Sequence, residues 1–465
     1  MRRTKIIATI GPSTCSDERL DELVSAGMDV ARLNASHSRP DELDVRVKAV
    51  RSAAERAGRH VAIMLDLAGP KVRMGIVAKD TVLSAGQSFI LFAEERPGDA
   101  SGASVTYQGL AQDLRPGDRI LVDDGRIELS VESISGGDVY TRVVTGGTLV
   151  SRKGVNVPGV TLSVDPITSY DEEVLRFGLK AQVDYVAQSF VRSAEDIVRL
   201  RRLMGDETVP IVAKVEKHEA MGHIDEIVEV SDAVMVARGD LGVETSPEQV
   251  PVFQRKIIEV CRDRSTPVIV ATQMLESMIL APRPTRAEAS DVANAIFSRV
   301  DAVMLSAETA VGAYPAESVE TMATIAMTAE ASLGPSRPRH AGEATTDVTR
   351  AVSTAVRELA EELKVVAIVT ATQSGSTARA VAGHRPLVPI IAVTPFAQVA
   401  RRLALVWGVT PVVLPLAEET TQMLIAIDEM LLRTGVAKPG DRVAVTAGIA
   451  SRSAGATDFV VVRTV

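Results

Sequence analysis

The chain has 465 residues, which is enough for two or three domains of ordinary size. Its 60 acidic residues outnumber its 51 lysines and arginines, and the net charge of −9 argues against a protein that binds nucleic acid or a membrane surface. The apolar runs fall far short of the roughly 20 residues that span a bilayer. The chain has two cysteines, Cys15 and Cys261, and so small a number favours an interpretation as buried free thiols in a reducing cytoplasm.

Eight short apolar runs recur along the first 306 residues, and each is apolar on both faces, as a strand buried on both sides must be. Most are separated by one segment of amphipathic-helix length, which is the pattern of parallel βα units. Eight such units predict a closed (β/α)8 TIM barrel, whose active-site face is formed by the C-terminal ends of the strands. The runs are residues 5–10, 29–34, 61–66, 185–189, 211–216, 234–240, 268–273 and 302–306.

The helical pattern stops after the third run, where short alternating stretches are bounded by turn signals such as Arg115-Pro116-Gly117-Asp118. They predict a small β-barrel domain over residues 70–162, inserted at the barrel mouth, where it can act as a lid. The catalytic barrel then comprises residues 1–69 and 163–335. After a linker, helices and strands alternate again over residues 345–465, which predicts a C-terminal open-sheet α/β domain with a regulatory role.

Lys214 and Glu216 are two apart on a predicted strand, so both side chains point to the same side, the inside of the barrel. Asp240 ends the next strand, and Glu216 and Asp240 together can hold one Mg²⁺, which typically binds one or two carboxylates, water and substrate oxygens. An ammonium beside that ion requires an anion between them, and phosphate is the natural candidate. A structural ion pair is the alternative for Lys214 and Glu216.

A second polar cluster follows the second strand and comprises Arg32, Asn34, Ser36 and His37. Arg32, and Arg73 at the start of the insertion, suit bidentate contacts to phosphate oxygens. Taken singly, an arginine here is more often a surface residue and His37 more often structural. Their position among the strand ends of one barrel favours a functional role.

Six stretches of the chain resemble pyruvate kinases, among them Ala213-Lys214-Val215-Glu216 and the run from Arg283 to Ala295. The resemblance implies transfer of the phosphoryl group of phosphoenolpyruvate to ADP, giving pyruvate and ATP, with Mg²⁺ or Mn²⁺ as cofactor. It also implies a homotetramer. The stretches are residues 4–12, 28–37, 213–216, 235–244, 271–275 and 283–295.

The resemblance also implies site residues, with Glu216 and Asp240 holding the divalent ion. The implied catalytic residues are Lys214, which stabilises the phosphoryl group in flight, Arg32 and Thr272. The implied substrate contacts are Arg32, Lys214, Gly239, Asp240 and Thr272, and the implied nucleotide contacts are Asn34, Ser36, His37, Arg73 and Lys153. Thr272 acting through water, with Ser306 and Glu308 nearby, is the candidate proton donor to the enolate.

Two departures from the family concern potassium. Many members bind K⁺ with the residues matching Asn34, Ser36 and Asp66, followed by a threonine; here that position is Leu67, and the family's common Glu is Lys71. A fixed ammonium offsets the negative field that K⁺ would otherwise balance. We therefore expect an enzyme that needs Mg²⁺ but little or no K⁺. The alternative is that Lys71 is a solvated hinge residue of the lid.

In the C-terminal domain a strand is followed by hydroxyl-rich residues at a helix start, a combination that favours phosphate. This loop resembles the effector site of pyruvate kinases, although a plain helix cap explains it nearly as well. The residues are Thr372, Ser374, Gly375, Ser376 and Thr377, and the loop 447–455 would complete the pocket. AMP and several sugar phosphates remain possible effectors.

Two other functions fit parts of the pattern. A Mg²⁺-enolate lyase or aldolase would use Glu216 and Asp240 but would need neither the lid nor Lys214. A catalytically inactive metabolite sensor would use only the C-terminal domain, which the intact polar residues of the barrel mouth argue against.

Overall fold

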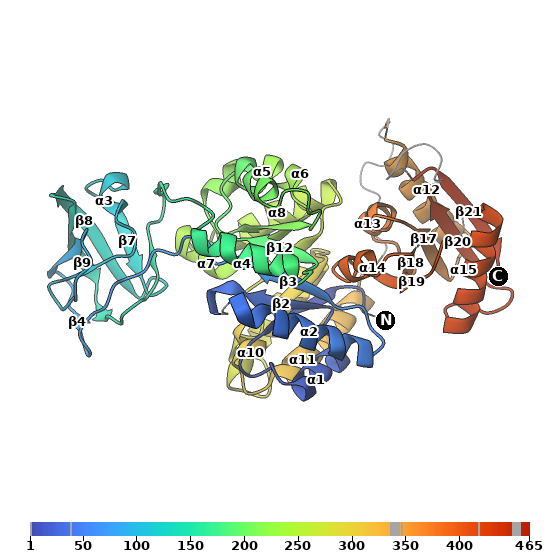
Figure 1. Cartoon of the computed structure of the whole chain (residues 1–465), viewed down its shortest axis with the longest axis horizontal. Helices are drawn as coiled ribbons and strands as arrows, with labels where there is room; N and C mark the ends of the chain where they lie inside the picture. The colour runs from blue at the N-terminus through green and yellow to red at the C-terminus, as the bar shows by residue number, and fades with distance from the viewer. Residues whose placement is uncertain (1, 38–39, 335–344, 346, 417–418, 449–456) are drawn as a thin grey trace.

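The computed structural model describes all residues except 1, 38–39, 335–344, 346, 417–418 and 449–456. Figure 1 shows three bodies in a row: an all-β domain at one end, a barrel surrounded by helices in the middle, and an α/β domain at the other end. The all-β domain and the C-terminal domain therefore contact opposite ends of the central barrel.

The central body is a closed barrel in which every neighbouring pair of strands is parallel. The predicted (β/α)8 barrel is confirmed. Around the barrel run the strands in the order β1-β16-β15-β14-β13-β12-β3-β2. Their bounds are β1 (Lys5–Ile10), β2 (Val30–Asn34), β3 (Ala62–Asp66), β12 (Tyr185–Gln188), β13 (Ile211–Val215), β14 (Ala233–Ala237), β15 (Val268–Ala271) and β16 (Ala302–Leu305).

Helices surround this barrel, and two of them, α4 and α9, begin with complete capping boxes at Thr168 and Thr285. Short helical turns follow several strands at the mouth. The helices that surround the barrel are α1 (Asp17–Ala26), α2 (Pro40–Arg56), α4 (Ser169–Lys180), α5 (Ala194–Leu203), α6 (Ile224–Val230), α8 (Val250–Asp263), α9 (Arg286–Phe297) and α11 (Pro315–Ala331). Those at the mouth are η1 (Ala35–His37), η2 (Glu219–Gly222), α7 (Arg238–Glu244), η3 (Glu276–Ile279) and α10 (Ala307–Ala310).

Alternation along the strands determines which side chains point into the barrel. One buried cluster takes residues from all eight strands and includes Val212, so it fills the inside. Ala213 and Val215 belong instead to the layer between barrel and helices. Because successive side chains on a strand point to opposite faces, Lys214 points inward, on the same side as Val212.

The insertion is an all-β domain with a six-stranded sheet in the order β11-β7-β8-β9-β5-β6. Residues 72–77 run between its two edge strands and hydrogen bond to both sides: Gly75 donates to Ser104 O (2.7 Å), and Met74 donates to Lys153 O (2.8 Å). This segment bridges the two edges of the six-stranded sheet through isolated backbone pairs. Its elements are β4 (Val82–Leu83), β5 (Ser88–Phe92), β6 (Gly102–Ser104), α3 (Leu110–Asp113), β7 (Arg119–Val122), β8 (Ile127–Ser135), β9 (Asp138–Thr145), β10 (Gly147–Thr148) and β11 (Val155–Asn156).

The C-terminal domain is an open five-stranded sheet in the order β19-β18-β17-β20-β21, with β21 antiparallel at one edge. Two separate apolar clusters lie against it, so that helices cover both faces. The predicted open-sheet α/β domain is confirmed. Its elements are α12 (Val348–Glu362), β17 (Ala367–Ala371), α13 (Ser376–Gly383), β18 (Ile390–Thr394), α14 (Ala397–Leu403), β19 (Val409–Val413), α15 (Thr420–Thr434), β20 (Arg442–Ala447) and β21 (Phe459–Thr464).

The C-terminal domain closes the floor of the barrel, at the end opposite the mouth. Ala404 and Leu405, which follow α14, belong to the apolar cluster inside the barrel. The Tyr185 hydroxyl donates to Arg402 O at 2.7 Å, and the buried Lys5 ammonium donates to Val409 O at 2.7 Å. The interior of the barrel is therefore completed by a segment far away in the sequence.

The structure also bears on the expected state of the two cysteines and on membrane-spanning helices. Both cysteines are free, but only Cys261 is buried, and Cys15 is exposed, contrary to the expectation for that residue. The reason is that Cys15 lies in the loop before α1 rather than on a core-facing side of an element. No described helix is both long and apolar enough to pass through a membrane.

A buried ion pair at the barrel floor generates the first prediction. Arg385 donates to Asp301 at 2.7 Å, and both side chains are at most 4% exposed. Asp301→Ala leaves a buried guanidinium without its counter-charge, so we expect a loss of about 3–5 kcal/mol in the free energy of unfolding, measured by urea denaturation. Glu22→Ala, in the exposed pair with Arg19, is the control and should cost at most about 1 kcal/mol. Equal effects of the two substitutions would contradict the prediction.

Candidate active site

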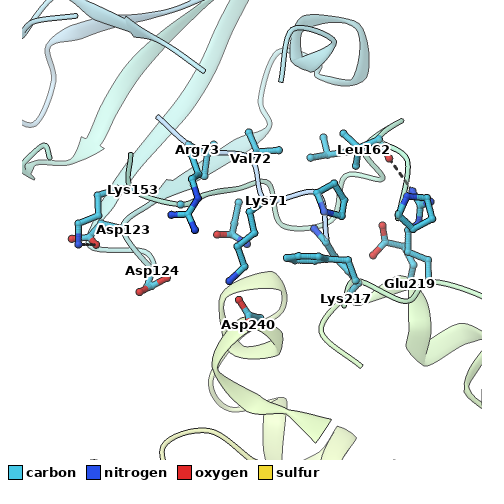
Figure 2. A pocket seen from close by; sticks show the side chains of 18 residues that line it. Lys71, Val72, Arg73, Asp123, Asp124, Lys153, Leu162, Lys217, Glu219 and Asp240 are labelled. Carbon is cyan, nitrogen blue, oxygen red and sulfur yellow. Dashed lines mark hydrogen bonds and ion pairs between the residues drawn. The ribbon is translucent and has the colours of Figure 1, made fainter. Parts of the chain in front are cut away.

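Two cavities lie at the C-terminal ends of the barrel strands. The outer one, about 490 Å³, is formed between the inserted domain and the barrel, and Figure 2 shows the side chains that line it. The inner one, about 50 Å³, lies directly above the barrel interior. Lys71 and Asp240 line both cavities, and in Figure 2 their charged ends point toward each other. The two cavities therefore meet at these residues.

The inner cavity is built around the Lys214 ammonium, whose side chain is 9% exposed. Its nitrogen lies 2.8 Å from Glu216 Oε1, 3.1 Å from Asp66 Oδ1 and 2.6 Å from the Ser189 hydroxyl. Asp66 also accepts from Arg32 Nε at 2.7 Å. Asp66 thus bridges the two cations predicted for the substrate phosphate, and its position at the end of β3, opposite Asn34 in the register, follows from strand pairing.

The electrostatics of this cluster favour the charged forms of Lys214 and Asp66. Burial alone would lower the pKa of Lys214, but the carboxylates of Asp66 and Glu216 outweigh burial and raise it. Burial would raise the pKa of Asp66, but Lys214 and Arg32 lower it. Glu216 is different: burial, together with the nearby carboxylates of Asp240 and Asp66, raises its pKa against the opposing effect of Lys214. The Lys214 ammonium is therefore charged at neutral pH. The raised pKa of Glu216 means that an additional cation near Glu216 and Asp240 would stabilise the ionised form of Glu216.

Residues 189–190 position both members of the Lys-x-Glu pair, a role that the sequence did not reveal. The Ser189 hydroxyl donates to Leu67 O (2.7 Å) while accepting from Lys214. The Phe190 amide donates to Glu216 Oε2 at 2.8 Å. Phe190 has a φ of +56°. Its ring packs against Gly69, where a Cβ would lie 2.6 Å from the ring, so only glycine fits at position 69. The one feature of the sequence that could have indicated this role is the position of Ser189 at the end of a predicted barrel strand.

Glu216 and Asp240 both line the inner cavity, and carboxylates are the protein ligands that a divalent cation such as Mg²⁺ prefers. Within the described residues the Asp240 carboxylate has no hydrogen-bond or ion-pair partner, and its charge contributes to the raised pKa of Glu216. The described part of the chain contains no cluster of three or more His, Cys, Asp or Glu side chains arranged for a metal. Two carboxylates together with water and substrate oxygens are a usual ligand set for Mg²⁺ or Mn²⁺, although Glu216 Oε1 lies 2.8 Å from Lys214 Nζ and Glu216 Oε2 accepts from the Phe190 amide.

The strand end at Thr272 is held in a strained conformation. Thr272 and Gln273 have φ +68° and +54°, which is costly for residues other than glycine and is typical of functional sites. Arg238 holds this turn: its guanidinium donates to Thr272 O (2.7 Å) and pairs with Asp291 at 2.6 Å. The Thr272 hydroxyl accepts from the Gly239 amide at 2.8 Å. The turn thereby places Thr272 in the lining of the inner cavity, with the Gly239 amide bonded to its hydroxyl.

The candidate proton-donor neighbours have different surroundings. Glu308 accepts from two backbone amides, of Leu275 (3.1 Å) and Ser306 (2.7 Å), so its carboxylate ties two loops of the mouth together. The Ser306 hydroxyl is buried without a hydrogen-bond partner among the described residues. Of these two side chains, Ser306 has the free hydrogen-bonding capacity.

The predicted nucleotide contacts divide between the two cavities. Arg73 and Lys153 line the outer cavity, where Arg73 donates to Arg152 O (3.0 Å) and Lys153 pairs with Asp123 (2.7 Å). Asn34 and Ser36 line the inner cavity together with Leu67 and Lys71. His37 ends η1, and its side chain lies outside the described part of the structure.

A buried carboxylate connects the inserted domain to the barrel. Glu244 Oε1, at the end of α7, accepts from Lys217 Nζ and from Asn156 Nδ2 of β11, both at 2.8 Å. Glu244 is 1% exposed, and Lys217 and Asn156 both line the outer cavity. These hydrogen bonds thus join the barrel side and the inserted-domain side of the outer cavity.

The predicted effector loop precedes α13. Gly375 has φ +84°, and its amide donates to the Thr372 hydroxyl at 2.9 Å. The Ser374 and Ser376 hydroxyls are 3.0 Å apart, and Thr377 pairs with Thr457 at 2.7 Å. Most of the loop expected to complete the pocket, residues 449–455, lies outside the described residues.

Comparison with known proteins finds two matching families, described as "Pyruvate kinase, barrel domain" over residues 1–319 and "Pyruvate kinase, alpha/beta domain" over residues 350–463. A protein named pyruvate kinase from Geobacillus stearothermophilus is 44% identical over 472 residues, which cover 100% of this chain and 80% of that protein. Pyruvate kinase 2 of Synechocystis sp. is 44% identical, with 100% and 79% covered. A pyruvate kinase from Staphylococcus epidermidis is 43% identical, with 100% and 81% covered.

The unpartnered carboxylate of Asp240 generates a prediction about metal binding. Asp240→Asn removes one of the two anionic ligands, so we expect the affinity for Mn²⁺, measured by electron paramagnetic resonance titration, to fall at least about tenfold. Asp44→Asn, at an exposed carboxylate paired with Lys48 on α2, should leave the affinity unchanged. Unaltered Mn²⁺ affinity in the Asp240 variant would place the metal elsewhere.

Proposed function

The chain belongs to the pyruvate kinase family, and we propose that its barrel mouth transfers the phosphoryl group of phosphoenolpyruvate to ADP, giving pyruvate and ATP. The observation that carries this proposal is the buried, charged Lys214 held between Asp66 and Glu216. A phosphoryl group in flight spreads negative charge over its oxygens and needs fixed positive groups around it. An enolate lyase or aldolase would not need that ammonium beside the metal.

In the proposed reaction, the bond between the enol oxygen and phosphorus breaks as a bond forms to a terminal oxygen of ADP. Arg32 binds the phosphate of the substrate, and Lys214 contacts the phosphoryl oxygens during transfer. Both cations are preorganised, since Asp66 holds the Arg32 guanidinium at 2.7 Å and the Lys214 ammonium at 3.1 Å. Fixed charges in a site shielded from water need no reorganisation when the reaction occurs.

Glu216 and Asp240 would hold Mg²⁺ or Mn²⁺, which supplies Lewis-acid stabilisation of the departing enolate oxygen. Gly239 and Thr272 face the substrate carboxylate and enolate in this proposal. The enolate carbon then takes a proton to become the methyl group of pyruvate. Thr272, acting through water beside the buried Ser306 hydroxyl, is the proposed donor.

The outer cavity is the proposed nucleotide site, with Arg73 and Lys153 from the inserted domain facing the phosphates of ADP. Asn34, Ser36 and His37 would contact the nucleotide from the barrel side. Closure of the inserted domain would exclude water from the transfer, which prevents hydrolysis.

We also propose a role for each of the three domains. Residues 1–69 with 163–335 would form the catalytic barrel, residues 70–162 the lid, and residues 345–465 a regulatory domain. A phosphorylated effector at the loop from Thr372 to Thr377, a homotetrameric assembly and a cytoplasmic location are further expectations from the family resemblance and the composition.

The role of Lys214 is tested by Lys214→Met, which keeps the length of the side chain and removes its charge. We expect turnover of phosphoenolpyruvate with ADP, followed by coupled pyruvate reduction, to fall at least about 1000-fold because the transferring group loses its charge stabilisation. Mn²⁺ binding should persist, since the competing ammonium is gone and both carboxylates remain.

Lys256→Met, at an exposed lysine of α8 outside both cavities, is the matched control and should retain full turnover. If Lys214→Met keeps substantial activity while Mn²⁺ still binds, Lys214 is not the group that stabilises the transfer.

The expected independence from K⁺ is tested separately. Lys71 supplies a fixed ammonium at the junction of the cavities, and the side chain of Leu67, which is 2% exposed, has no oxygen to offer a cation. Activity in Tris buffer should rise less than about tenfold on adding K⁺ at constant ionic strength, and Lys71→Glu should make the enzyme markedly K⁺-dependent because the compensating charge is reversed. Lys79→Glu, at an exposed lysine of the inserted domain, should leave the K⁺ response as it is. Strong K⁺ activation of the unaltered chain would refute the hypothesis.

A further inference from the structure

Glu244 is a buried carboxylate that no step of the proposed reaction uses. It ends α7, the helix that carries Asp240, and its side chain is 0% exposed. One carboxylate oxygen, Oε1, accepts from Lys217 of the barrel and from Asn156 of the inserted domain, both at 2.8 Å. The other oxygen, Oε2, is buried without a hydrogen-bond partner among the described residues. The charge of Glu244 is therefore stabilised by one donor from each domain.

The burial of Glu244 favours its contact with Asn156. A carboxylate removed from water is costly unless donors replace the lost hydration. A hydrogen bond to an ionised group is also stronger than one between neutral groups. If the inserted domain moved away from the barrel, Glu244 would keep Lys217 and lose Asn156. The carboxylate thus holds the inserted domain against the barrel more strongly than a neutral acceptor would.

Asn156 ends the segment that carries the two cations proposed for the nucleotide. Residues 72–74 pair with residues 152–155 through backbone hydrogen bonds of 2.8 to 3.1 Å. This pairing contains both Arg73 and Lys153, which Figure 2 shows on the inserted-domain side of the outer cavity. Since Asn156 directly follows the paired segment, a contact that fixes Asn156 also fixes the position of both cations.

The barrel side of the same contact leads to the proposed metal ligands. Lys217 directly follows Glu216, and its ammonium lies 5.7 Å from the centre of the Phe190 ring, within the range of a cation–π interaction. The Phe190 amide in turn donates to Glu216 Oε2. Asp240 lies four residues before Glu244 on α7, so the two side chains share one face of the helix. Glu244 therefore connects the nucleotide side of the mouth to the metal side.

We propose that Glu244 is a positioning residue for the nucleotide. By accepting from Asn156, it holds the inserted domain where Arg73 and Lys153 reach the phosphates of ADP. This inference rests on the proposed phosphoryl transfer, because ADP is the ligand that the two cations would bind. Glu244 does not itself line the outer cavity, so it acts on the nucleotide through the segment that ends at Asn156.

The first test is steady-state kinetics of the full chain, followed by coupled pyruvate reduction. Asn156→Asp places a second carboxylate beside Glu244, and the repulsion should raise the KM for ADP at least about tenfold. The KM for phosphoenolpyruvate should change less than about threefold, because its proposed contacts Arg32 and Lys214 belong to the barrel. Asn156→Ala, which only removes the donor, should show the same selective rise for ADP.

A reciprocal exchange separates this role from a direct contact between Asn156 and the nucleotide. In the double variant Asn156→Asp with Glu244→Gln, the amide and the carboxylate change places, and one negative charge remains near Lys217. The hydrogen bond can then form in the opposite direction, so the KM for ADP should return to within about threefold of that of the unaltered chain. If Asn156 bound ADP directly, a change at Glu244 would not restore binding.

The matched control is Gln112→Glu, the same change from amide to acid at an exposed position on α3 of the inserted domain. It should leave both KM values unchanged.

A distance measurement tests the position of the inserted domain without turnover. Nitroxide labels at Lys79→Cys in the inserted domain and Lys48→Cys on α2, both exposed, report the separation of the two domains by double electron–electron resonance. Cys15→Ser removes the exposed native thiol. We expect longer or broader distances in Asn156→Asp than in the unaltered sequence at that position, and recovery in the double variant.

The proposal is overturned if Asn156→Asp leaves either the KM for ADP or the distances unchanged. It is also overturned if the KM for phosphoenolpyruvate rises as much as that for ADP, or if the double variant does not recover. Absence of turnover in the unaltered chain would instead refute the proposed phosphoryl transfer. In that case the distances still decide whether Glu244 holds the inserted domain in place.

Discussion

The Lys214 ammonium lies inside the barrel within 3.1 Å of two carboxylates and a hydroxyl, and the rest of the site is arranged around it. Removing a charge from water costs several kcal/mol, which only close and well-oriented partners can offset. Here Asp66 and Glu216 do so, and Asp66 holds Arg32 at the same time. The site therefore carries fixed positive charge where a phosphoryl group would need it, before any substrate arrives.

The strand β12 connects this cluster to the opposite end of the barrel. At its first residue the Tyr185 hydroxyl donates to Arg402 O of the C-terminal domain, and immediately after its last residue Ser189 accepts from Lys214. Lys5 on β1 likewise reaches Val409 O. The C-terminal domain is thus part of the barrel's packing, so a change at the junction acts on the same strands that end at the active site.

The inserted domain completes the mouth in a similar way. Its β11 contributes Asn156 to Glu244, and its first residues place Lys71 where the inner and outer cavities meet. Charge and shape at the mouth consequently come from two domains.

The sequence by itself determined the barrel, the open C-terminal sheet and the shared inward face of Lys214 and Glu216, because these depend on periodicity over a few residues. It also placed Asp66 at the end of a strand and Thr272 directly after one, whereas Asp240, predicted to end a strand, lies in helix α7 beyond β14. Tertiary structure alone decided that Asp66 bridges Arg32 and Lys214, that the Phe190 amide holds Glu216, and that Arg238 holds the strained turn at Thr272. These partners lie 26 or more residues apart in the chain, and strand register and loop packing, which no local pattern encodes, bring them together.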